Sequence, residues 1–371
     1  MRVTIERSNL MRALGHAQRV VERKNTIPIL SNVLLKAEGG TLTLKATDLD
    51  LEVTEKVAAA VDQDGATTVP AHMLYDIVRK LPDGSEVGLS VGDDAGLRLV
   101  SGRSQFRLQM LPEDDFPDLT AADFTHTFRM GAGDLKGLID RTQFAISNEE
   151  TRYYLNGIYL HHVEEDATSY LRAVATDGHR LAQAQIAAPD GAAGMPGVIV
   201  PRKAVGEIQK LVDGADDQVT VELSEAKIRI TVGDVVLTSK LIDGTFPDYK
   251  RVIPAGNDKV LTLDRATFAS AVDRVSTIAS DRGRAVKLAM ENGQMVLTVN
   301  NPDSGSAEEE IAVGYDAEPL EIGFNSRYLL DITAQLSADE TTFLLADPGS
   351  PTLIREKDEA AALYVLMPMR V

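Results

Sequence analysis

The chain has 371 residues, no cysteine and a formal net charge of -18 at pH 7. This length predicts two or three domains, and the absence of cysteine excludes disulfides and thiolate metal sites. The net charge alone argues against a partner as acidic as DNA. The N-terminal residues lack the apolar core of a signal peptide, and no segment is apolar enough to span a membrane. We therefore expect a soluble, cytoplasmic protein.

Three segments of the chain share the same pattern of apolar residues. They are Met1–Val21, His126–Ile146 and Lys259–Ala279, and shifts of 125 and then 133 residues align them without gaps. In each, a short alternating run precedes apolar residues at helical spacing. The matched positions are Ile5, Met130 and Leu263, then Leu10, Leu135 and Phe268, and then Leu14, Ile139 and Val272.

A second helical pattern follows Pro70, Pro201 and Asn325 in the same three parts of the chain. Alternating runs typical of strands lie between and after the helices, at Thr41–Leu44, Gln218–Leu223, Lys227–Val232 and Met295–Val299. The repeat predicts three similar α+β domains, each of two helices packed on antiparallel sheet. Phe-Pro-Asp at positions 116–118 and 246–248 marks the linkers, and the domains are expected at residues 1–121, 122–250 and 251–371.

The basic residues are unevenly distributed. In the first helix Arg12, His16 and Arg19 lie opposite the apolar face, which by itself is typical of a solvated surface. The six expected helices together carry twelve basic and seven acidic residues, a balance of +5 within an acidic chain. If their polar faces formed one surface, that surface would meet phosphates without reading bases. The expected helices are Asn9–Val20, Ala71–Leu81, Asp134–Ala145, Arg202–Leu211, Asp264–Ile278 and Ser326–Leu336.

No catalytic or cofactor motif is visible, so we expect no enzyme activity, no cofactor and no metal site. Phosphate-binding glycine loops, HExxH and GxSxG are absent. His161 and His162 are adjacent in a strand-like run and therefore face opposite sides. The carboxylates of Asp48, Asp50 and Glu52 alternate; they fit either a metal site or, preferably, a solvated strand face.

Several motifs, in chain order, resemble the beta sliding clamp family of bacterial DNA polymerase III. They are Thr26-Ile27-Pro28-Ile29-Leu30, Ser101-Gly102-Arg103-Ser104, Arg152-Tyr153-Tyr154-Leu155-Asn156-Gly157, Ala175-Thr176-Asp177-Gly178-His179-Arg180-Leu181-Ala182, Val200-Pro201-Arg202-Lys203, Phe246-Pro247-Asp248-Tyr249 and the ending Tyr364-Val365-Leu366-Met367-Pro368-Met369-Arg370-Val371. The likeness covers essentially the whole chain. It implies a DNA clamp fold and a head-to-tail homodimeric ring with helices inside and sheets outside.

The resemblance also implies function and partners. Members encircle duplex DNA without reading its sequence and tether the replicative polymerase. A clamp loader and other proteins would bind through short clamp-binding peptides. The family's peptide pocket carries over to Arg152, Leu155, Thr176, Gly178, His179, Arg180, Leu181, Pro247, Arg251, Val252, Pro351, Val365, Leu366, Met367, Pro368, Met369 and Arg370. Its apolar members, methionines included, suit varied short peptides.

The resemblance implies two further sets of residues. The candidate DNA contacts are Lys24, Tyr153, Tyr154, Arg202, Lys203, Lys210, Arg282 and Arg284. The candidate subunit interface is Arg103, Phe106, Leu108 and Ile278. The chain departs from the family pattern at His72, at Glu149 and in ending on Val371. A sequence-specific DNA regulator and an unrecognised hydrolase or transferase stay open as rivals, although neither a compact basic recognition helix nor a catalytic constellation is visible.

Overall fold

The computed structural model describes residues 1–92, 96–119, 123–215, 218–279, 284–356 and 361–371. The chain folds into two compact units. Unit 1 comprises Met1–Gly133, Asp190–Ala192 and Gly206–Leu241, and unit 2 comprises Asp134–Pro189, Ala193–Val205 and Ile242–Val371. Each unit is therefore assembled from separated stretches of sequence.

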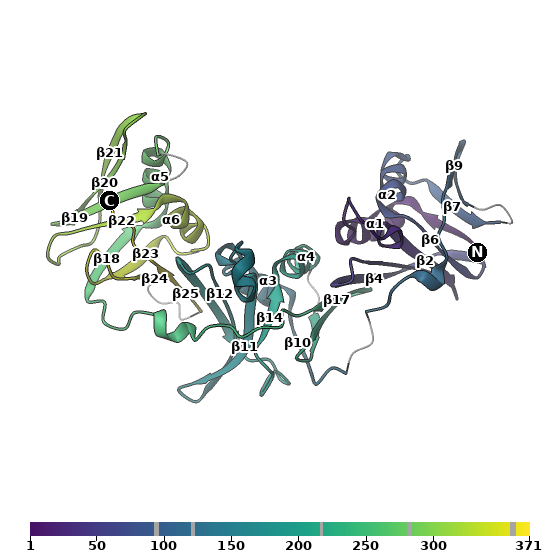
Figure 1. Ribbon diagram of the computed structural model, residues 1–371, viewed down its shortest axis with the longest axis horizontal. Helices are drawn as coiled ribbons and strands as arrows, with labels where there is room; N and C mark the ends of the chain where they lie inside the picture. Colours follow the sequence, from purple (N-terminus) through teal and green to yellow (C-terminus); the bar gives the residue numbers. More distant parts are fainter. Residues whose placement is uncertain (93–95, 120–122, 216–217, 280–283, 357–360) are drawn as a thin grey trace. The chain divides into compact units, whose positions relative to one another are not determined.

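Unit 1 begins with the first strand and helix of the repeat. Strand β1 (Arg2–Glu6) leads into α1 (Arg7–Val20), whose apolar face buries Leu10 and Leu14. The Glu6 carboxylate caps α1 by accepting the Ser8 N–H, which satisfies one of the free donors at the helix start. Helix α2 (Ala71–Lys80) packs beside α1 (Figure 1). Both helices lie where the apolar spacing predicts them.

Two antiparallel sheets complete unit 1. The eight-stranded sheet has the order β10 (His126–Gly131), β15 (Gln218–Leu223), β16 (Lys227–Val232), β17 (Val235–Lys240), β4 (Leu51–Ala58), β3 (Thr41–Thr47), β2 (Asn32–Glu38) and β6 (Gly65–Pro70). The five-stranded sheet has the order β5 (Ala60–Gln63), β1, β7 (Glu86–Val91), β8 (Leu97–Ser101) and β9 (Ser104–Leu108).

Unit 2 repeats this plan with α5 (Arg265–Ser276) packed beside α6 (Ser326–Thr333). Its eight-stranded sheet has the order β14 (Val198–Pro201), β11 (Gly157–Glu165), β12 (Thr168–Thr176), β13 (Arg180–Ala187), β25 (Ala362–Leu366), β24 (Thr352–Glu356), β23 (Glu340–Leu345) and β18 (Lys259–Asp264). Its four-stranded sheet has the order β21 (Gly305–Ala312), β20 (Gln294–Asn301), β19 (Ala285–Glu291) and β22 (Leu320–Asn325).

The remaining two expected helices are α3 (Ala132–Asp140) and α4 (Arg202–Val212). The expected helix Asp134–Ala145 is shorter than predicted, because residues 143–145 form a separate 3-10 turn. Helix α6 likewise ends three residues before Leu336. Each described helix is too short or too polar to cross a lipid bilayer.

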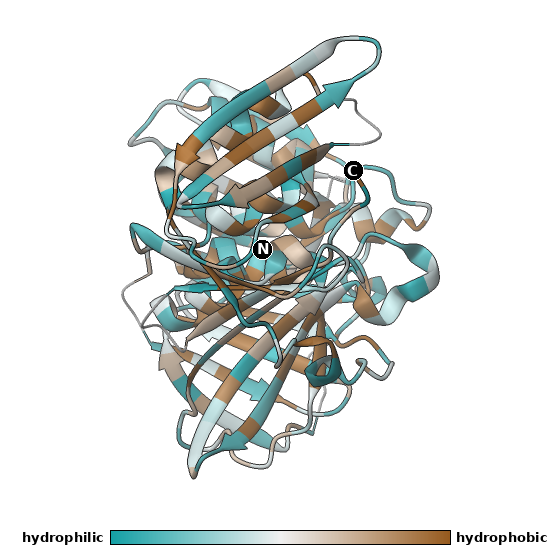
Figure 2. Cartoon of the chain, turned by 90° about the vertical axis from the view of Figure 1, so that its left-hand side faces the viewer, coloured by the Kyte–Doolittle hydropathy of each residue, from teal (hydrophilic) through white to brown (hydrophobic). Residues whose placement is uncertain are grey.

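The strands form because apolar and polar residues alternate along them. In β3, Leu42 and Leu44 are buried while Thr41, Thr43 and Lys45 are half-exposed. Figure 2 shows the same change of brown and teal along the strands. One face of each sheet therefore turns to the helices and the other stays accessible.

Both eight-stranded sheets are made of two four-stranded halves. In unit 1, β4 of one half pairs with β17 of the other, with Val53 opposite Leu237. In unit 2, β13 pairs with β25 in the same way, with Leu181 opposite Val365. The two smaller sheets each contain one such half, and they end on β9 and β21, beyond which no further strand lies among the described residues.

The structure corrects one sequence expectation. Asp48 and Asp50 do not belong to a strand; Asp48 Oδ1 accepts the N–H groups of Asp50 and Leu51 in a turn in which Leu49 has a φ of 79°. Glu52 is in β4 but is buried, and burial raises the pKa of its carboxyl. A solvated carboxylate face is therefore wrong for Glu52. Within the described ranges, no three metal-ligating side chains gather.

Candidate functional site

Three of the apolar residues predicted to share a pocket, Leu155, Leu181 and Val365, belong to one cluster in unit 2. Leu181 on β13 and Val365 on β25 are paired across the sheet, and both are buried. Leu155, from the 3-10 turn η4 (Glu150–Leu155), packs into the same cluster. Phe246 and Tyr249 of the predicted linker also belong to it. Residues far apart in sequence thus share one apolar core beneath the candidate site.

Exposed apolar side chains lie on the segments that flank this core. Val252 is 49% exposed and precedes Ile253, which packs on the cluster. Met367 is 40% exposed, and its N–H donates to the His179 carbonyl at 2.9 Å. The Met369 N–H donates to the Gly323 carbonyl at 2.8 Å. The chain end is therefore held in place after β25 while a methionine side chain remains accessible.

A tight turn after β12 shapes the neighbouring surface. Thr176 Oγ1 donates to the Arg180 carbonyl at 2.7 Å, and Asp177 Oδ1 accepts the His179 N–H at 2.9 Å. Gly178 has a φ of 89°, and a Cβ there would lie 2.6 Å from Arg152 Nη1. Only glycine fits this position without displacing the arginine.

Arg152, expected to hold polar or acidic peptide atoms, already has a carboxylate partner. Its Nε and Nη2 donate to the two Glu149 oxygens at 2.8 and 2.6 Å. Nη2 also donates to the Asp177 carbonyl at 3.0 Å. The hydrogen bonds from Arg152 lower the pKa of the Glu149 carboxyl. Arg251 is far more exposed and contacts Asp248 at 2.8 Å.

Arg180, a predicted pocket residue, is used internally. Its guanidinium contacts Asp331 of α6 at 2.6 Å, donates to the Phe144 carbonyl at 2.6 Å and lies 4.1 Å from the centre of the Tyr328 ring. Leu366 is fully buried. These two residues can act on a ligand only by positioning others. The sequence carried no signal for the Asp331 contact, which joins residues 151 positions apart.

Comparison with known proteins agrees with this geometry along the full length. The family models for the DNA polymerase III beta subunit match residues 1–120 (N-terminal domain), 130–248 (central domain) and 250–370 (C-terminal domain). The chain belongs to the DNA polymerase III beta subunit family. It is 54% identical to the beta sliding clamp of Caulobacter vibrioides and 39% identical to that of Escherichia coli, with 100% of both chains covered in each comparison.

Solved structures of the family are equally close. The sliding clamp of Bartonella birtlesii bound to griselimycin has a TM-score of 0.98 at 62% identity, with 100% of both chains covered. The beta sliding clamp of Caulobacter crescentus also has a TM-score of 0.98, at 53% identity over 100% of this chain and 99% of that one. The α+β fold expected from the repeat and the clamp fold implied by the family resemblance are confirmed.

The residues predicted to touch DNA differ in their surroundings. Tyr153 is 53% exposed on η4 and lies edge-on to Tyr154. Arg202 Nη2 donates to the Ile146 and Ser147 carbonyls at 2.8 Å each, and burial lowers its pKa. Arg202 therefore helps to fix the chain before η4.

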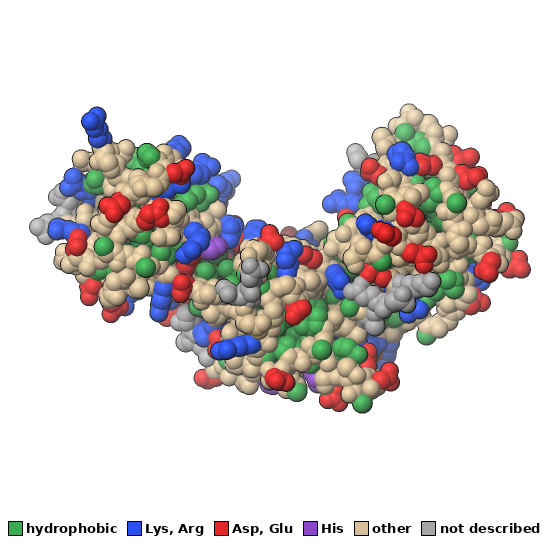
Figure 3. Space-filling model, turned by 180° about the vertical axis from the view of Figure 1, so that it is seen from behind, with side chains coloured by type: hydrophobic (Ala, Val, Ile, Leu, Met, Phe, Trp, Pro, Cys, Tyr) green, Lys and Arg blue, Asp and Glu red, His purple; other side chains and the backbone are tan. Residues whose placement is uncertain are grey.

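The other predicted DNA residues are dispersed. Lys24 is exposed in unit 1, and Lys210 contacts Glu207 at 2.8 Å. Lys203 and Arg284 are half-buried in unit 2, and Arg282 lies outside the described residues. Figure 3 shows acidic and basic side chains interspersed over the visible face. This face of the protein thus carries both signs of charge.

The residues predicted to form the subunit interface are split between a sheet edge and the interior. Phe106 lies on β9, the last strand of its sheet, and is 36% exposed. Leu108 is only 8% exposed, so it packs within its own unit. Ile278 follows α5 and is half-buried, and its carbonyl accepts the Asn301 side-chain amide at 2.7 Å. Of the two apolar strand residues, Phe106 is the accessible one.

A buried polar network fixes the linker beside the candidate pocket. Arg172 Nη1 donates to the Tyr249 hydroxyl at 3.1 Å, and that hydroxyl lies 3.0 Å from His161 Nε2. Since Arg172 has only donors, the hydroxyl proton is left for His161. The Phe246 ring stacks on Tyr159 with centroids 4.9 Å apart. The linker is therefore anchored to β11 and β12.

This network gives a pH prediction. Burial, followed by the nearby charge of Arg172, lowers the pKa of His161 from 6.5 to about 4. The folded state therefore disfavours protonation, so stability is complete above pH 6.5 and is lost as pH falls toward 4. We expect His161 to account for roughly 2–3 kcal/mol of that loss, measured as the free energy of unfolding in urea from pH 7 to 4.

The matched variants are His161→Gln, which removes the titrating group, and His179→Gln, whose side chain is exposed. The first should flatten the pH dependence and the second should not. An identical decline in all three proteins would remove His161 as the cause.

Proposed function

We propose that this chain is the subunit of a ring-shaped sliding clamp. The ring encircles duplex DNA without sequence preference and tethers the replicative polymerase and other DNA-processing proteins. It catalyses no reaction; it is a processivity factor. The subunit has three clamp domains, residues 1–121, 122–250 and 251–371, and acts in the cytoplasm. The observation that carries this proposal is the full-length likeness to beta sliding clamps.

The sheet architecture supports closure into a ring. Within each unit, a four-stranded half is completed by another half through its last strand. The halves that end on β9 and β21 are left with open backbone donors and acceptors, which favour pairing with a further strand. Pairing β9 of one subunit with β21 of another repeats the same junction. Two such head-to-tail contacts close a dimer.

The charges on these two edges are complementary. Arg103 and Arg107 lie on the β9 hairpin and are exposed, while Glu308 and Glu310 are exposed on β21. Opposite charges on facing strands steer association and fix register. The acidic strand extends the predicted interface set of Arg103, Phe106, Leu108 and Ile278.

We expect a stable homodimer that depends on β9. Light scattering at micromolar concentration should give twice the chain mass of 40.1 kDa. Phe106→Asp should yield monomers, because it places a charge in an apolar contact. We choose Phe106 alone, since Leu108 supports its own unit. Val260→Asp is the matched control, as Val260 is 46% exposed on β18 outside the interface. A wild-type monomer at this concentration would contradict the ring.

The second function of the subunit is to bind peptides at the cluster of Leu155, Leu181 and Val365. We propose that the flexible side chains of Met367 and Met369, with Val252, accept apolar peptide residues. The proposed set also includes Thr176, Gly178, His179, Pro247, Pro351, Pro368 and Arg370, with Arg152 and Arg251 facing polar peptide atoms. Arg180 and Leu366 belong to the set as residues that position the others.

Removal of Met367–Val371 tests the peptide site. The deletion begins after the last residue of β25, so the sheet pairing remains intact. The affinity for a fluorescent clamp-binding peptide, measured by fluorescence anisotropy, should fall at least tenfold, because the accessible methionine surface is lost. The mass in solution should stay that of a dimer. Unchanged peptide affinity in the truncated dimer would withdraw the site.

The clamp mechanism is topological. The net charge of -18 leaves direct attraction to DNA weak, and phosphate contacts weaken further as salt rises. A closed ring threaded on DNA escapes only through a DNA end or an opened interface. We propose that Lys24, Tyr153, Tyr154, Arg202, Lys203, Lys210, Arg282 and Arg284 supply the weak contacts that permit sliding.

Retention on circular DNA tests this mechanism. Protein loaded on a nicked circle by a clamp loader with ATP should survive a wash in about 1 M salt, where electrostatic contacts are screened within about 3 Å. A single cut that linearises the circle should release it. Equal salt sensitivity on circles and on linear fragments would mean ordinary electrostatic binding, and the clamp function would be abandoned.

A further inference from the structure

Two buried carboxylates on the helical side of unit 1 contact basic side chains that are more exposed than they are. Glu55 occupies a position in β4 between Val53 and Val57, where the sheet faces α1. Its side chain is 2% exposed; it accepts from Arg12 Nε at 3.1 Å and lies 2.7 Å from His16 Nδ1. The polar face of α1, expected to be merely solvated, is thus tied to the sheet.

Glu207 on α4 makes a second arrangement of this kind. Its side chain is 11% exposed, and it contacts Arg19 Nε at 2.9 Å and Lys210 Nζ at 2.8 Å. The side chains of Arg19 and Lys210 are 30% and 52% exposed. In both arrangements, the arginine and lysine side chains lie further outward than the carboxylate that they contact.

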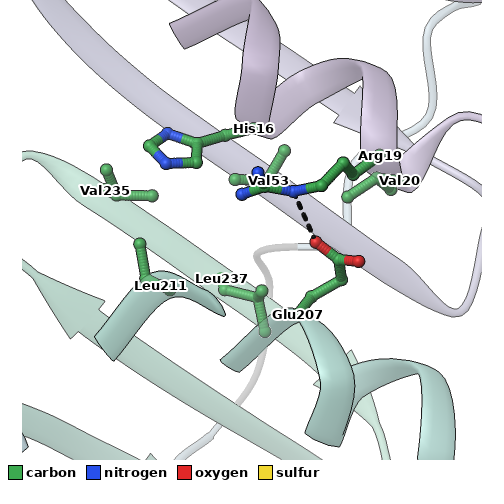
Figure 4. Close-up of a pocket in the computed structure, with 8 residues that line it drawn as sticks. All are labelled: His16, Arg19, Val20, Val53, Glu207, Leu211, Val235 and Leu237. Atoms are coloured by element: carbon green, nitrogen blue, oxygen red, sulfur yellow. Dashed lines mark hydrogen bonds and ion pairs between the residues drawn. The ribbon is translucent and has the colours of Figure 1, made fainter. Parts of the chain in front are cut away.

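The surroundings strengthen these ion pairs. Figure 4 shows the Arg19–Glu207 contact at a small pocket whose other walls include Val20, Val53 and Leu237. Apolar walls lower the effective dielectric constant, so the attraction exceeds that of a fully solvated pair. A carboxylate that is covered and covalently tethered cannot diffuse away when a phosphate approaches, unlike a counterion.

We infer that Glu55 and Glu207 hold down the clamp's attraction for DNA by neutralising the basic side chains that face the phosphates. The inference rests on the proposed function, in which the helices line the DNA channel. Each carboxylate serves two basic groups, so a phosphate gains less from meeting them, and fewer counterions are released from the DNA. Low affinity favours sliding, while the closed ring supplies retention.

A competing effect has the opposite sign. A carboxylate that orders an arginine or lysine also pre-organises it for a ligand, and loss of that order weakens binding. Coulombic attraction changes by the whole charge of the removed carboxylate at a distance of a few ångströms, whereas the exposed Lys210 loses only side-chain order. We therefore expect neutralisation to dominate, and the two effects are separated by the sign of the change.

The test measures binding of the dimer to a linear fluorescein-labelled duplex between about 50 and 200 mM salt. Glu207→Gln keeps the side-chain shape and removes the charge. Its Kd at the lowest salt should fall roughly three- to tenfold, and the slope of log K against log salt should steepen by about one to two, since the ring holds two copies. Glu55→Gln should act in the same direction, which guards against a fault of either variant alone.

The matched control is Glu222→Gln. Glu222 is an ion-paired carboxylate on β15, 3.7 Å from Arg229, and alternates with the buried Val221 and Leu223. Glu222 therefore lies on the sheet face away from the core. The Glu222→Gln variant changes the net charge by the same amount as Glu207→Gln and Glu55→Gln. Its salt slope should equal that of the wild type. An equal gain in this variant would show that net charge alone acts, and would overturn the inference.

Folded dimer is confirmed for each variant by light scattering and by the urea midpoint. Weaker binding or an unchanged slope in both Glu207→Gln and Glu55→Gln dimers overturns the inference. Salt-resistant retention of the wild type on nicked circles reports on the clamp function separately. Failure there removes the proposed function, whereas success there with unchanged slopes removes only the role of the two carboxylates.

Discussion

The architecture depends on one constraint, which is that a strand at the end of a sheet needs a partner for its backbone hydrogen-bonding groups. Backbone donors and acceptors at a sheet edge are costly to leave unpaired when they are covered. Unit 1 answers this by joining β4 to β17, and unit 2 by joining β13 to β25. The middle third of the chain supplies one half-sheet to each unit. Continuity of the backbone ladder, rather than a loop or a small apolar patch, holds the repeats together.

Electrostatics is arranged around that framework. Acidic residues dominate the composition, yet the helices carry more basic than acidic groups. The structure shows that part of this excess is cancelled by a carboxylate outside the helices, because Arg12 contacts Glu55 of β4. Counting charges on helices therefore overstates the field that a phosphate meets. The distances between groups, not their number, decide the attraction.

Much of the fold was readable from sequence, because helical and strand periodicities repeat three times. Leu10 and Leu14 face the core as their spacing predicts. Contacts between distant residues were not readable in the same way. Arg180 looks like a ligand-binding residue in its motif but contacts Asp331 of α6. Glu52 follows the alternating pattern of a solvated strand but is covered, its carboxylate accepting the Leu119 N–H at 3.0 Å.

The candidate site shows the same division. The family resemblance places Gly178 in the site, and the structure supplies the reason, since its positive φ and the close approach of Arg152 both require glycine. The pairing of Arg152 with Glu149 depends on a bend within η4, where Arg152 has φ -110° and ψ 53°. Neither propensity nor spacing fixes that bend, so the carboxylate partner had no sequence signal.

The interleaving of the two units also determines when each strand can find its partner during synthesis. A nascent chain completes β4 at Ala58, but its partner β17 begins only at Val235, and β13 ends at Ala187 while β25 begins at Ala362. At ribosomal speeds of about 5–20 residues per second, each edge waits roughly 10–35 s for its partner. During that wait the open strand is a template for mispairing with other nascent chains. Exposure of these edges during translation is therefore a folding hazard that is separate from the stability of the finished protein.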